Sequence, residues 1–396
     1  MQKISRLILA SACAIACAPA GAASAPQHHS GPTHYRITIL SSLGGTNSRA
    51  NSIDNLGIIG GYSKTAGNLV RHASVWAFGH QRDLGTLGGP SVNSSVAWPV
   101  KNNVLLISGI SETGAHNPLG ESWSCGAFFA TTGNICYGFV TSLLGGPMQA
   151  LLPLPGGYNS FATGTNDWGV TVGWAENGVH DPSCDPDSGQ ILQFKPVTWR
   201  WGSSQPHALP LIDGDSSGAA TAINDRGQIV GISGSCDQAV GRRTATHAVV
   251  WENGRVTDLG NLGGDSWNTA GAINENGDIV GFSGTRPGDL DGTYTHAFLK
   301  RRFGTMQDLG VLAAGDISST ATSINRWGQV VGYSNDEATT RAFLWQNGTM
   351  VSLASLAPEF TGTLVLANDI NDFGQIVGRG TDPVTGAIAA FLATPD

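Results

Sequence analysis

A short pattern that recurs along the chain constrains its fold more than any other feature. The clearest copy is Ala272–Ser283, AINENGDIVGFS, in which two apolar runs flank the turn Asn274–Gly277. Asn accepts local backbone hydrogen bonds in a turn, and Gly adopts left-handed backbone angles without Cβ strain. Because alternating apolar residues flank the turn, the pattern predicts a tight β-hairpin.

The same hairpin recurs along the chain. Strong copies lie at Ala222–Ser233, Ser323–Ser334 and Asp369–Gly380, weaker ones at Ser52–Ser63 and Gly164–Ala175, and a degraded one at Lys101–Ser111. The closing glycines of consecutive copies are 46 to 64 residues apart, at Gly61, Gly109, Gly173, Gly231, Gly281, Gly332 and Gly378. Such spacing indicates a repeat architecture.

Each hairpin is followed by further short apolar runs. A third run lies at His72–Trp76, Ala127–Ala130, Pro196–Trp199, His247–Trp251, His296–Lys300, Arg341–Trp345 and Ala389–Ala393. A fourth run with a Leu/Gly-rich tail is clear at Arg82–Gly89, Thr257–Gly264 and Gln307–Gly315. Four strands in a unit of about fifty residues are typical of a β-propeller blade.

The two ends of the chain predict how the repeats close. The last repeat stops after its third run, and the missing fourth run is found at Ile37–Gly45, which matches Val256–Gly264. We therefore predict an all-β, seven-bladed β-propeller of four-stranded antiparallel blades. It would be closed by the N-terminal strand pairing into the C-terminal blade, which hides the edges of an open array.

These repeats resemble the bacterial extracellular HAF-repeat family, named after a His-Ala-Phe triplet. His296–Phe298 is the full match, His72 and His247 begin partial matches, and the INxxGQxVG and DLGxLGG elements match as well. The resemblance covers nearly the whole mature chain and implies an extracellular repeat protein. It brings no agreed activity and no catalytic residues. The second repeat departs most from the pattern.

The first residues predict export. Lys3 and Arg6 precede the apolar run Leu7–Ala18, and Ala20–Ala22 forms a small-residue cleavage site, so residues 1–22 read as a signal peptide. The apolar run is too short to span a bilayer, and lipid attachment at Cys17 is a weaker alternative. We expect a secreted or periplasmic protein with a flexible leader over residues 23–34 and a single propeller domain over 35–396.

The composition limits the classes of partner that the protein is expected to bind. Charged residues make up 13% of the chain and the net charge is −8 without any basic run, which argues against a nucleic-acid partner. No later stretch is long and apolar enough to span a membrane. We expect a monomer that binds a glycan or protein ligand, without a cofactor.

The cysteines outside the signal predict disulfides, because an even number in an exported chain is typical of pairing. We predict the pairs Cys125–Cys136, across the segment read as the third run of the second repeat, and Cys184–Cys236, between neighbouring blades. A zinc site is the alternative, but the cysteines lack the paired short spacing of such sites.

Residues repeated in most blades are expected to be structural, because a catalytic residue is needed once. The third-run histidines His72, His247 and His296 are predicted to form hydrogen bonds or to lie in the core. A tryptophan shared by several third runs is predicted to pack between blades, at Trp76, Trp199, Trp251 and Trp345.

Residues without a repeat counterpart are the candidates for binding. We predict that they gather on the face formed by the second-to-third-strand loops and the blade connections, where loop length varies. These residues are Trp123, His180, Asp181, Asp185, Asp187, Trp267, Asp289, Asp291, Asp336 and Glu337. Solvated loop carboxylates are the simpler interpretation of the acids. The segment Asp213–Gly218 echoes a calcium loop but lacks its bidentate Glu.

Two functions remain open from the sequence. The first is a secreted, non-enzymatic propeller that binds a glycan or protein through its variable-loop face. The second is a carbohydrate-active hydrolase or lyase with carboxylates near the central channel, which would require two converging carboxyls. No nucleophile elbow, HExxH or P-loop motif is present.

Overall fold

The computed structural model describes residues 34–99, 101–121, 123–126, 129, 132–184, 189–236 and 245–396, and residues 32–396 form one compact unit. The regular secondary structure of the described residues is almost entirely β-strand, as predicted. Helical turns are confined to α1 (Trp123–Gly126), η1 (Ala66–Asn68) and η2 (Ala354–Leu356). No helix in the described part is long and apolar enough to cross a membrane.

Five of the sheets have four strands each, joined in sequence order. They are β6 (Ser95–Ala97), β7 (Leu106–His116), β8 (Asn134–Ser142), β9 (Gln149–Leu151); β10 (Ser160–Thr165), β11 (Val170–His180), β12 (Leu192–Arg200), β13 (His207–Ala208); β14 (Ser217–Ile223), β15 (Ile229–Gly234), β16 (His247–Glu252), β17 (Arg255–Asp258); β18 (Thr269–Ile273), β19 (Ile279–Gly284), β20 (Thr295–Lys300), β21 (Met306–Gly310); and β22 (Ser318–Ile324), β23 (Val330–Asn335), β24 (Thr340–Gln346), β25 (Thr349–Ser352). All their pairings are antiparallel.

The remaining eight strands form one sheet made of two four-stranded groups. The first group is β2 (Gly44–Ile53), β3 (Ile59–Thr65), β4 (Arg71–Ala77) and β5 (His80–Asp83); the second is β26 (Leu364–Ile370), β27 (Ile376–Thr381), β28 (Ile388–Pro395) and β1 (Tyr35–Ile39). A single parallel bridge, Asn47 to Ile388, joins the groups.

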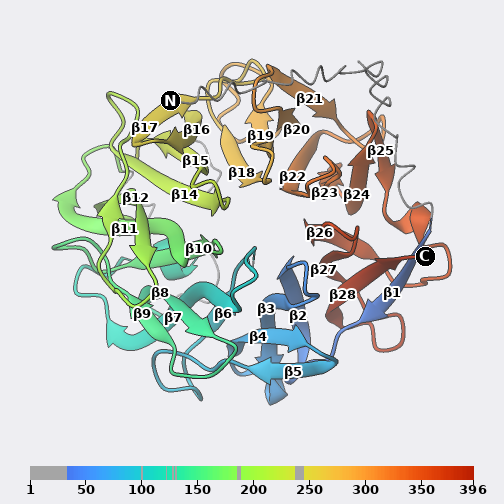
Figure 1. Cartoon of the computed structure of the whole chain (residues 1–396), viewed down its shortest axis with the longest axis horizontal. Coiled ribbons are helices and arrows are strands. Elements are labelled where there is room, and N and C mark those ends of the chain that lie inside the picture. The colour runs from blue at the N-terminus through green and yellow to red at the C-terminus, as the bar shows by residue number, and fades with distance from the viewer. Residues whose placement is uncertain are drawn as a thin grey trace, which may run out of the picture. The chain divides into compact units, whose positions relative to one another are not determined.

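Strand β1 occupies the outer position of the second group. It runs antiparallel to β28, with Tyr35 opposite Pro395 and Ile39 opposite Phe391, and Figure 1 shows β1 in blue beside the red β28. The first strand of each group lies toward the centre of the view and the fourth toward the outside. The repeated four-stranded antiparallel unit and the β-propeller fold are therefore confirmed.

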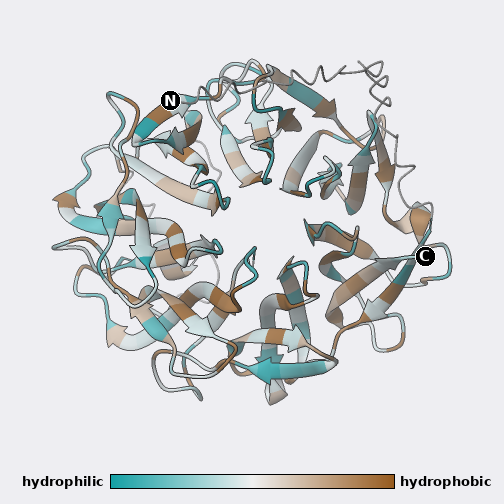
Figure 2. Ribbon diagram, in the orientation of Figure 1, coloured by the Kyte–Doolittle hydropathy of each residue, from teal (hydrophilic) through white to brown (hydrophobic). Residues whose placement is uncertain are grey.

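The core lies between neighbouring groups, where the third strands contribute large side chains. Trp199 and Trp251 are 0% and 2% exposed, and their indole Nε1 atoms donate to the carbonyls of Leu152 and Pro210 in the preceding connections. The predicted packing role of the repeated tryptophans is confirmed. Figure 2 shows hydrophobic and neutral residues along the strands and hydrophilic residues at many of the turns nearest the centre.

The closing glycine of each hairpin is required by a close backbone approach. A Cβ atom built on Gly231 would lie 2.0 Å from the carbonyl oxygen of Ala219, and β14 bulges between Ala220 and Ala222. The same clash, at 1.8 to 2.0 Å, recurs at all seven aligned glycines. Any side chain here would displace the first strand.

The second repeat differs from the prediction. Its third strand is β8 (Asn134–Ser142), which pairs with β7, and not the run Ala127–Ala130, of which only Phe129 lies within the described residues. Phe139, opposite Gly109, is the buried aromatic of this strand. Both predicted disulfides are present, Cys125–Cys136 and Cys184–Cys236, although the first joins α1 to β8 rather than spanning a hairpin.

Candidate functional site

The turn between the first and second strands has the same geometry in every group. In sheet β22–β25, Asn325 Oδ1 accepts hydrogen bonds from the backbone N–H groups of Trp327 and Gln329, at 3.1 and 3.0 Å. The same bonds to positions two and four residues later are made by Asp54, Asn102, Asn166, Asn224, Asn274 and Asn371. The predicted role of these residues as turn formers is confirmed.

The side-chain amides of Asn166, Asn224, Asn274, Asn325 and Asn371 tie their turns to the next group, whereas that of Asn102 donates within its own turn to the Leu106 carbonyl. Asn325 Nδ2 donates to the carbonyl of Asn371 at 3.1 Å, and Asn371 Nδ2 donates to that of Asp54 at 3.0 Å. Equivalent bonds run from Asn166 to Asn224, from there to Asn274, and on to Asn325. Because the donors and acceptors are buried, these bonds fix the turns relative to one another.

These turns form a surface that we call the turn face. It comprises residues 54–57, 102–105, 166–169, 224–227, 274–277, 325–328 and 371–374, together with the turns between third and fourth strands. Both sets lie at the same ends of the strands because successive strands alternate in direction. The opposite surface, made of second-to-third-strand loops and connections between sheets, is the loop face.

The second turn position carries polar residues that extend these links. The backbone N–H of Asp167 donates to Asp225 Oδ1 at 2.8 Å, and that of Asp225 donates to Glu275 Oε1 at 3.0 Å. We call Asp167, Asp225 and Glu275 the acidic arc. Burial raises the pKa of Asp225, as does the neighbouring Asp167 carboxylate, and burial likewise raises the pKa of Glu275.

The third turn position exposes large apolar residues. Trp168 is 74% exposed and Trp327 is 58% exposed, and Leu56, Val104 and Phe373 are also exposed. The indole Nε1 of Trp168 donates to the Asp225 carbonyl at 2.8 Å, and that of Trp327 donates to the Asp372 carbonyl at 2.9 Å. The N–H of each indole is thus hydrogen-bonded to the next group, while much of the ring surface remains exposed to solvent.

A small cavity of about 100 Å³ lies between the turns. Its lining includes Asp54, Lys101 and Arg326. Lys101 Nζ lies 2.5 Å from Asp369 Oδ1 and donates to the Ile370 carbonyl at 2.9 Å. Burial raises the pKa of Asp54 to about 6. Two of these charged residues, Lys101 and Asp369, belong to different repeats and pair with one another.

Most of the binding residues predicted from the sequence belong to the loop face, and Asp185 and Asp187 lie outside the described residues. Several of the acidic side chains accept hydrogen bonds from backbone N–H groups of their own loops. Asp336 accepts hydrogen bonds from the N–H groups of Ala338 and Thr339, which lower its pKa to about 2. Asp289 Oδ2 accepts one from the N–H of Tyr294 at 2.7 Å. His180, Asp291 and Glu337 are exposed.

The two tryptophans predicted to bind a ligand differ in their exposure. Trp123 is 8% exposed, its ring centroid lies 4.6 Å from that of Phe194, and its Nε1 donates to Glu176 Oε1 at 3.0 Å. Trp123 therefore belongs to the core, and its prediction as a binding residue is wrong. Trp267 is half-buried and donates to the carbonyl of Leu290 at 3.0 Å.

Glu176 is a buried carboxylate that sequence reasoning missed. It accepts hydrogen bonds from Trp123 Nε1 and from Asn159 and Tyr158, which tie together the connection into β10, strand β11 and α1. Burial raises its pKa above the usual range, and the neighbouring Glu121 raises it further. All its contacts are internal, which makes Glu176 a structural residue of the loop face.

The residues that could hold a metal are few in the described part of the chain. The only group of three ligand-type side chains there is Asp181, Cys184 and Cys236. Its two sulfurs form a disulfide, so they offer no thiolate ligand. Asp181 instead accepts hydrogen bonds from Ser183 and Ser216. In the segment weighed as a calcium loop, Asp215 accepts one from Ser233.

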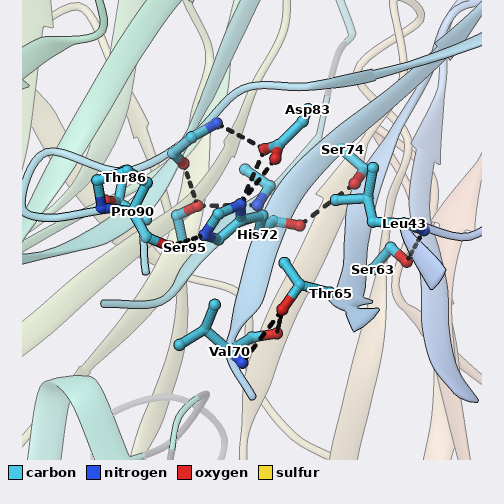
Figure 3. Close-up of polar contacts among 12 residues, drawn as sticks. Leu43, Ser63, Thr65, Val70, His72, Ser74, Asp83, Thr86, Pro90 and Ser95 are labelled. Atoms are coloured by element: carbon cyan, nitrogen blue, oxygen red, sulfur yellow. Dashed lines mark hydrogen bonds and ion pairs between the residues drawn. The ribbon is translucent and has the colours of Figure 1, made fainter. Parts of the chain in front are cut away.

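The repeated histidines join third and fourth strands through an aspartate. His72 Nδ1 lies 2.8 Å from Asp83 Oδ2, and its Nε2 lies 2.7 Å from the Pro90 carbonyl (Figure 3). Both partners accept only, so both ring nitrogens carry protons, which agrees with the raised pKa of His72 beside Asp83. His247–Asp258 and His296–Asp308 repeat the pair, and the predicted hydrogen-bonding role is confirmed.

Comparison with known proteins adds little. No protein-family model matches the chain, and no curated protein matches its sequence. Similar solved structures include a TolB-like protein from Agrobacterium tumefaciens (11% identity, TM-score 0.39, covering 74% of this chain and 99% of that one). Others are a gluconolactonase from Xanthomonas campestris (9%, 0.36, 91% and 90%) and an oligogalacturonate lyase in complex with manganese (13%, 0.36, 82% and 72%). Likenesses this distant carry no argument about function.

Proposed function

We propose that this protein is an exported, non-enzymatic binding module of the HAF-repeat type that holds a glycan on its turn face. Its scaffold is a seven-bladed propeller closed by β1. The two disulfides support a location outside the cytoplasm, since disulfides persist in oxidising compartments.

Closure is supported by hydrogen bonds from the last group to the first. Besides the bond from Asn371 to Asp54, Asn368 Nδ2 donates to the Ala50 carbonyl at 2.7 Å. The backbone N–H of Ile53 donates to Asp369 Oδ2 at 2.8 Å. The pairing of β1 with β28 then leaves the second group with four strands, like the others.

The proposal rests on the hydrogen bonding and the exposure of Trp168. Its N–H is already bonded to the Asp225 carbonyl, yet the residue is 74% exposed. An exposed aromatic ring in a fixed position offers a stacking surface at low entropic cost. The polar residues of the neighbouring turns supply hydrogen-bond partners for hydroxyl groups. A sugar ring presents both an apolar face and a rim of hydroxyls, so this combination favours a glycan.

Catalysis inside the channel is less well supported. Asp54 and Lys101 do line the cavity between the turns, and Lys101 pairs with Asp369 of another repeat, so two carboxylates come near each other as a hydrolase or lyase would require. However, Asp369 is 2% exposed and paired with Lys101. The cavity of about 100 Å³ is also smaller than the roughly 300–1,000 Å³ of small-molecule pockets. A glycan would therefore lie across the mouth rather than enter it.

Affinity electrophoresis against a panel of soluble polysaccharides, followed by calorimetry on any that retard the protein, tests the proposal. We expect Trp168→Ala to weaken binding at least about tenfold, as loss of an interface tryptophan typically does, and Trp327→Ala to weaken it by a smaller factor. Trp267→Ala and Asp289→Ala on the loop face are the matched controls. If only the control variants lose binding, the site is on the variable-loop face; if a protein ligand but no glycan binds, the ligand class is wrong.

A further inference from the structure

Sheet β10–β13 carries a tryptophan on each of its turn-face turns. Trp168 lies between β10 and β11, and Trp201 follows β12 and is 47% exposed. The backbone N–H of Trp201 donates to the Gly169 carbonyl at 2.8 Å, so the two turns are in direct contact. A Cβ on Gly169 would lie 3.0 Å from the Cβ of Trp201, so glycine there gives the second tryptophan room.

No other group has tryptophan at both positions. The corresponding pairs are Leu56 and Phe78, Val104 and Leu144, Arg226 and Asn253, Asn276 and Phe303, and Trp327 and Asn347. A scaffold residue recurs from repeat to repeat, whereas a ligand contact is needed once. The paired tryptophans are therefore better explained by binding than by the fold, since both are exposed and neither fills the core.

The acidic arc begins beside this pair. Asp167 precedes Trp168 in the chain, and the carbonyl that holds the Trp168 indole belongs to Asp225. The three turns of the arc carry three carboxylates and one basic side chain, Arg226, and the neighbouring turn adds Arg200 before Trp201. A negatively charged ligand over Trp168 would meet like charges, while hydroxyl groups would meet carboxylate acceptors.

We propose that Trp168 and Trp201 form the anchoring subsite of the glycan site and that it takes an uncharged polysaccharide chain. This inference rests on the proposed function and specifies its ligand. Exposed indoles on two turns that are hydrogen-bonded to each other can stack on different sugar units of one chain, so a polymer or a longer oligosaccharide binds better than a single sugar. The acidic arc excludes polyuronates.

The test compares neutral and acidic polymers on the intact protein. The probes are xyloglucan, galactomannan and laminarin against polygalacturonate and alginate, measured by calorimetry at low and moderate salt. Trp168→Ala and Trp201→Ala should each weaken the neutral ligand at least about tenfold, and Trp327→Ala, on another sheet, should weaken it less. The triple variant Asp167→Asn, Asp225→Asn, Glu275→Gln keeps a side-chain acceptor at each position. Because neutral amide oxygens are weaker acceptors than carboxylates, it should weaken neutral binding, but by less than about fivefold, and it should raise affinity for polygalacturonate about fivefold or more.

The outcomes separate this inference from the proposed function. If Trp327→Ala abolishes binding while Trp168→Ala and Trp201→Ala do not, the turn face still binds a glycan but the anchoring subsite is wrong. Loss with Trp168→Ala but not Trp201→Ala overturns the two-ring subsite. Tight polygalacturonate binding by the unmodified protein overturns the charge selection. If none of the five polymers binds, or no turn-face variant changes binding, both proposals fail.

Discussion

The side-chain amide of Asn371 donates a hydrogen bond to the backbone carbonyl of Asp54, 317 residues earlier in the chain. The same amide-to-carbonyl bond links neighbouring repeats elsewhere, so the last group meets the first as one repeat meets the next. Asn371 also accepts hydrogen bonds from the N–H groups of Phe373 and Gln375. One buried side chain thus forms its own turn and links the two ends of the repeat series.

Replacing Asn371 tests this link. Asn371→Ala removes a buried donor and leaves buried backbone groups unpaired, so we expect the free energy of unfolding to fall by about 2–4 kcal/mol. Urea denaturation followed by tryptophan fluorescence measures the change. The control is Asn55→Ala, whose hydrogen bonds to Asp372 cross the same junction but are exposed to solvent, so a smaller loss is expected. Equal losses from both variants would argue that the link carries no special stability.

The closing glycines allow a second stability test with a matched control. Gly231→Ala would place a Cβ 2.0 Å from the Ala219 carbonyl, whereas a Cβ on Gly164 meets nothing within 4 Å. Forcing the strands of sheet β14–β17 apart should cost about 3 kcal/mol or more, and Gly164→Ala should be nearly neutral. Thermal melts compare the two, and similar midpoints would contradict the close approach.

The disulfides are expected to differ in their effect. Cys184 and Cys236 are 52 residues apart, and Cys125 and Cys136 are 11 apart. In the chain-entropy model these loops stabilise the fold by about 4 and about 3 kcal/mol respectively. Double serine variants measured by urea denaturation test the order. A larger loss from the shorter loop would mean that packing around Cys125 outweighs the loop entropy.

The His72–Asp83 pair predicts a dependence on pH. Burial alone would raise the pKa of Asp83, but the hydrogen bonds from His72 and from the backbone N–H of Gly85, together with the charge on His72, outweigh burial and lower that pKa, while the bond to Asp83 raises the pKa of His72. The aspartate contributes stability that is lost as pH falls below about 4. The histidine contributes stability that is lost as pH rises above about 6.5 through its raised pKa.

The pair therefore stabilises most between about pH 4 and 6.5. Asp83→Asn should lower the melting midpoint most within this window and less on either side of it. A difference between variant and parent that does not vary from pH 3 to 9 would show that the pair is not ionised in the folded protein.

Repeat periodicity was enough to predict most of the β-propeller strands and the turns, and the even number of cysteines, placed on that repeat, predicted both disulfides. Asn274 and Gly277 specify their turn by local interactions alone. Once one copy of the turn is recognised, the turns of the other repeats can be predicted from it. The third strand of the second repeat, β8, was missed because Ala127–Ala130 is as apolar as Phe139 and its neighbours, and only pairing with β7 distinguishes them.

The candidate site was less predictable. Variable loop length pointed to the loop face, yet acids such as Asp336 bind their own loop there, and Trp123 is buried. Exposure of Trp168 could not be read from spacing, because the same turn position holds Leu, Val, Arg and Asn elsewhere. The available signal was that sheet β10–β13 alone has tryptophan in both turns, a departure from the repeat.

Hydrogen–deuterium exchange with and without a bound polysaccharide tests the central claim most directly, because it locates the ligand without any mutation. The account predicts slower exchange in peptides covering residues 166–169, 200–203 and 225–228 on the turn face, and unchanged exchange in residues 286–293 and 335–340 on the loop face. Protection confined to the loop-face peptides would contradict it.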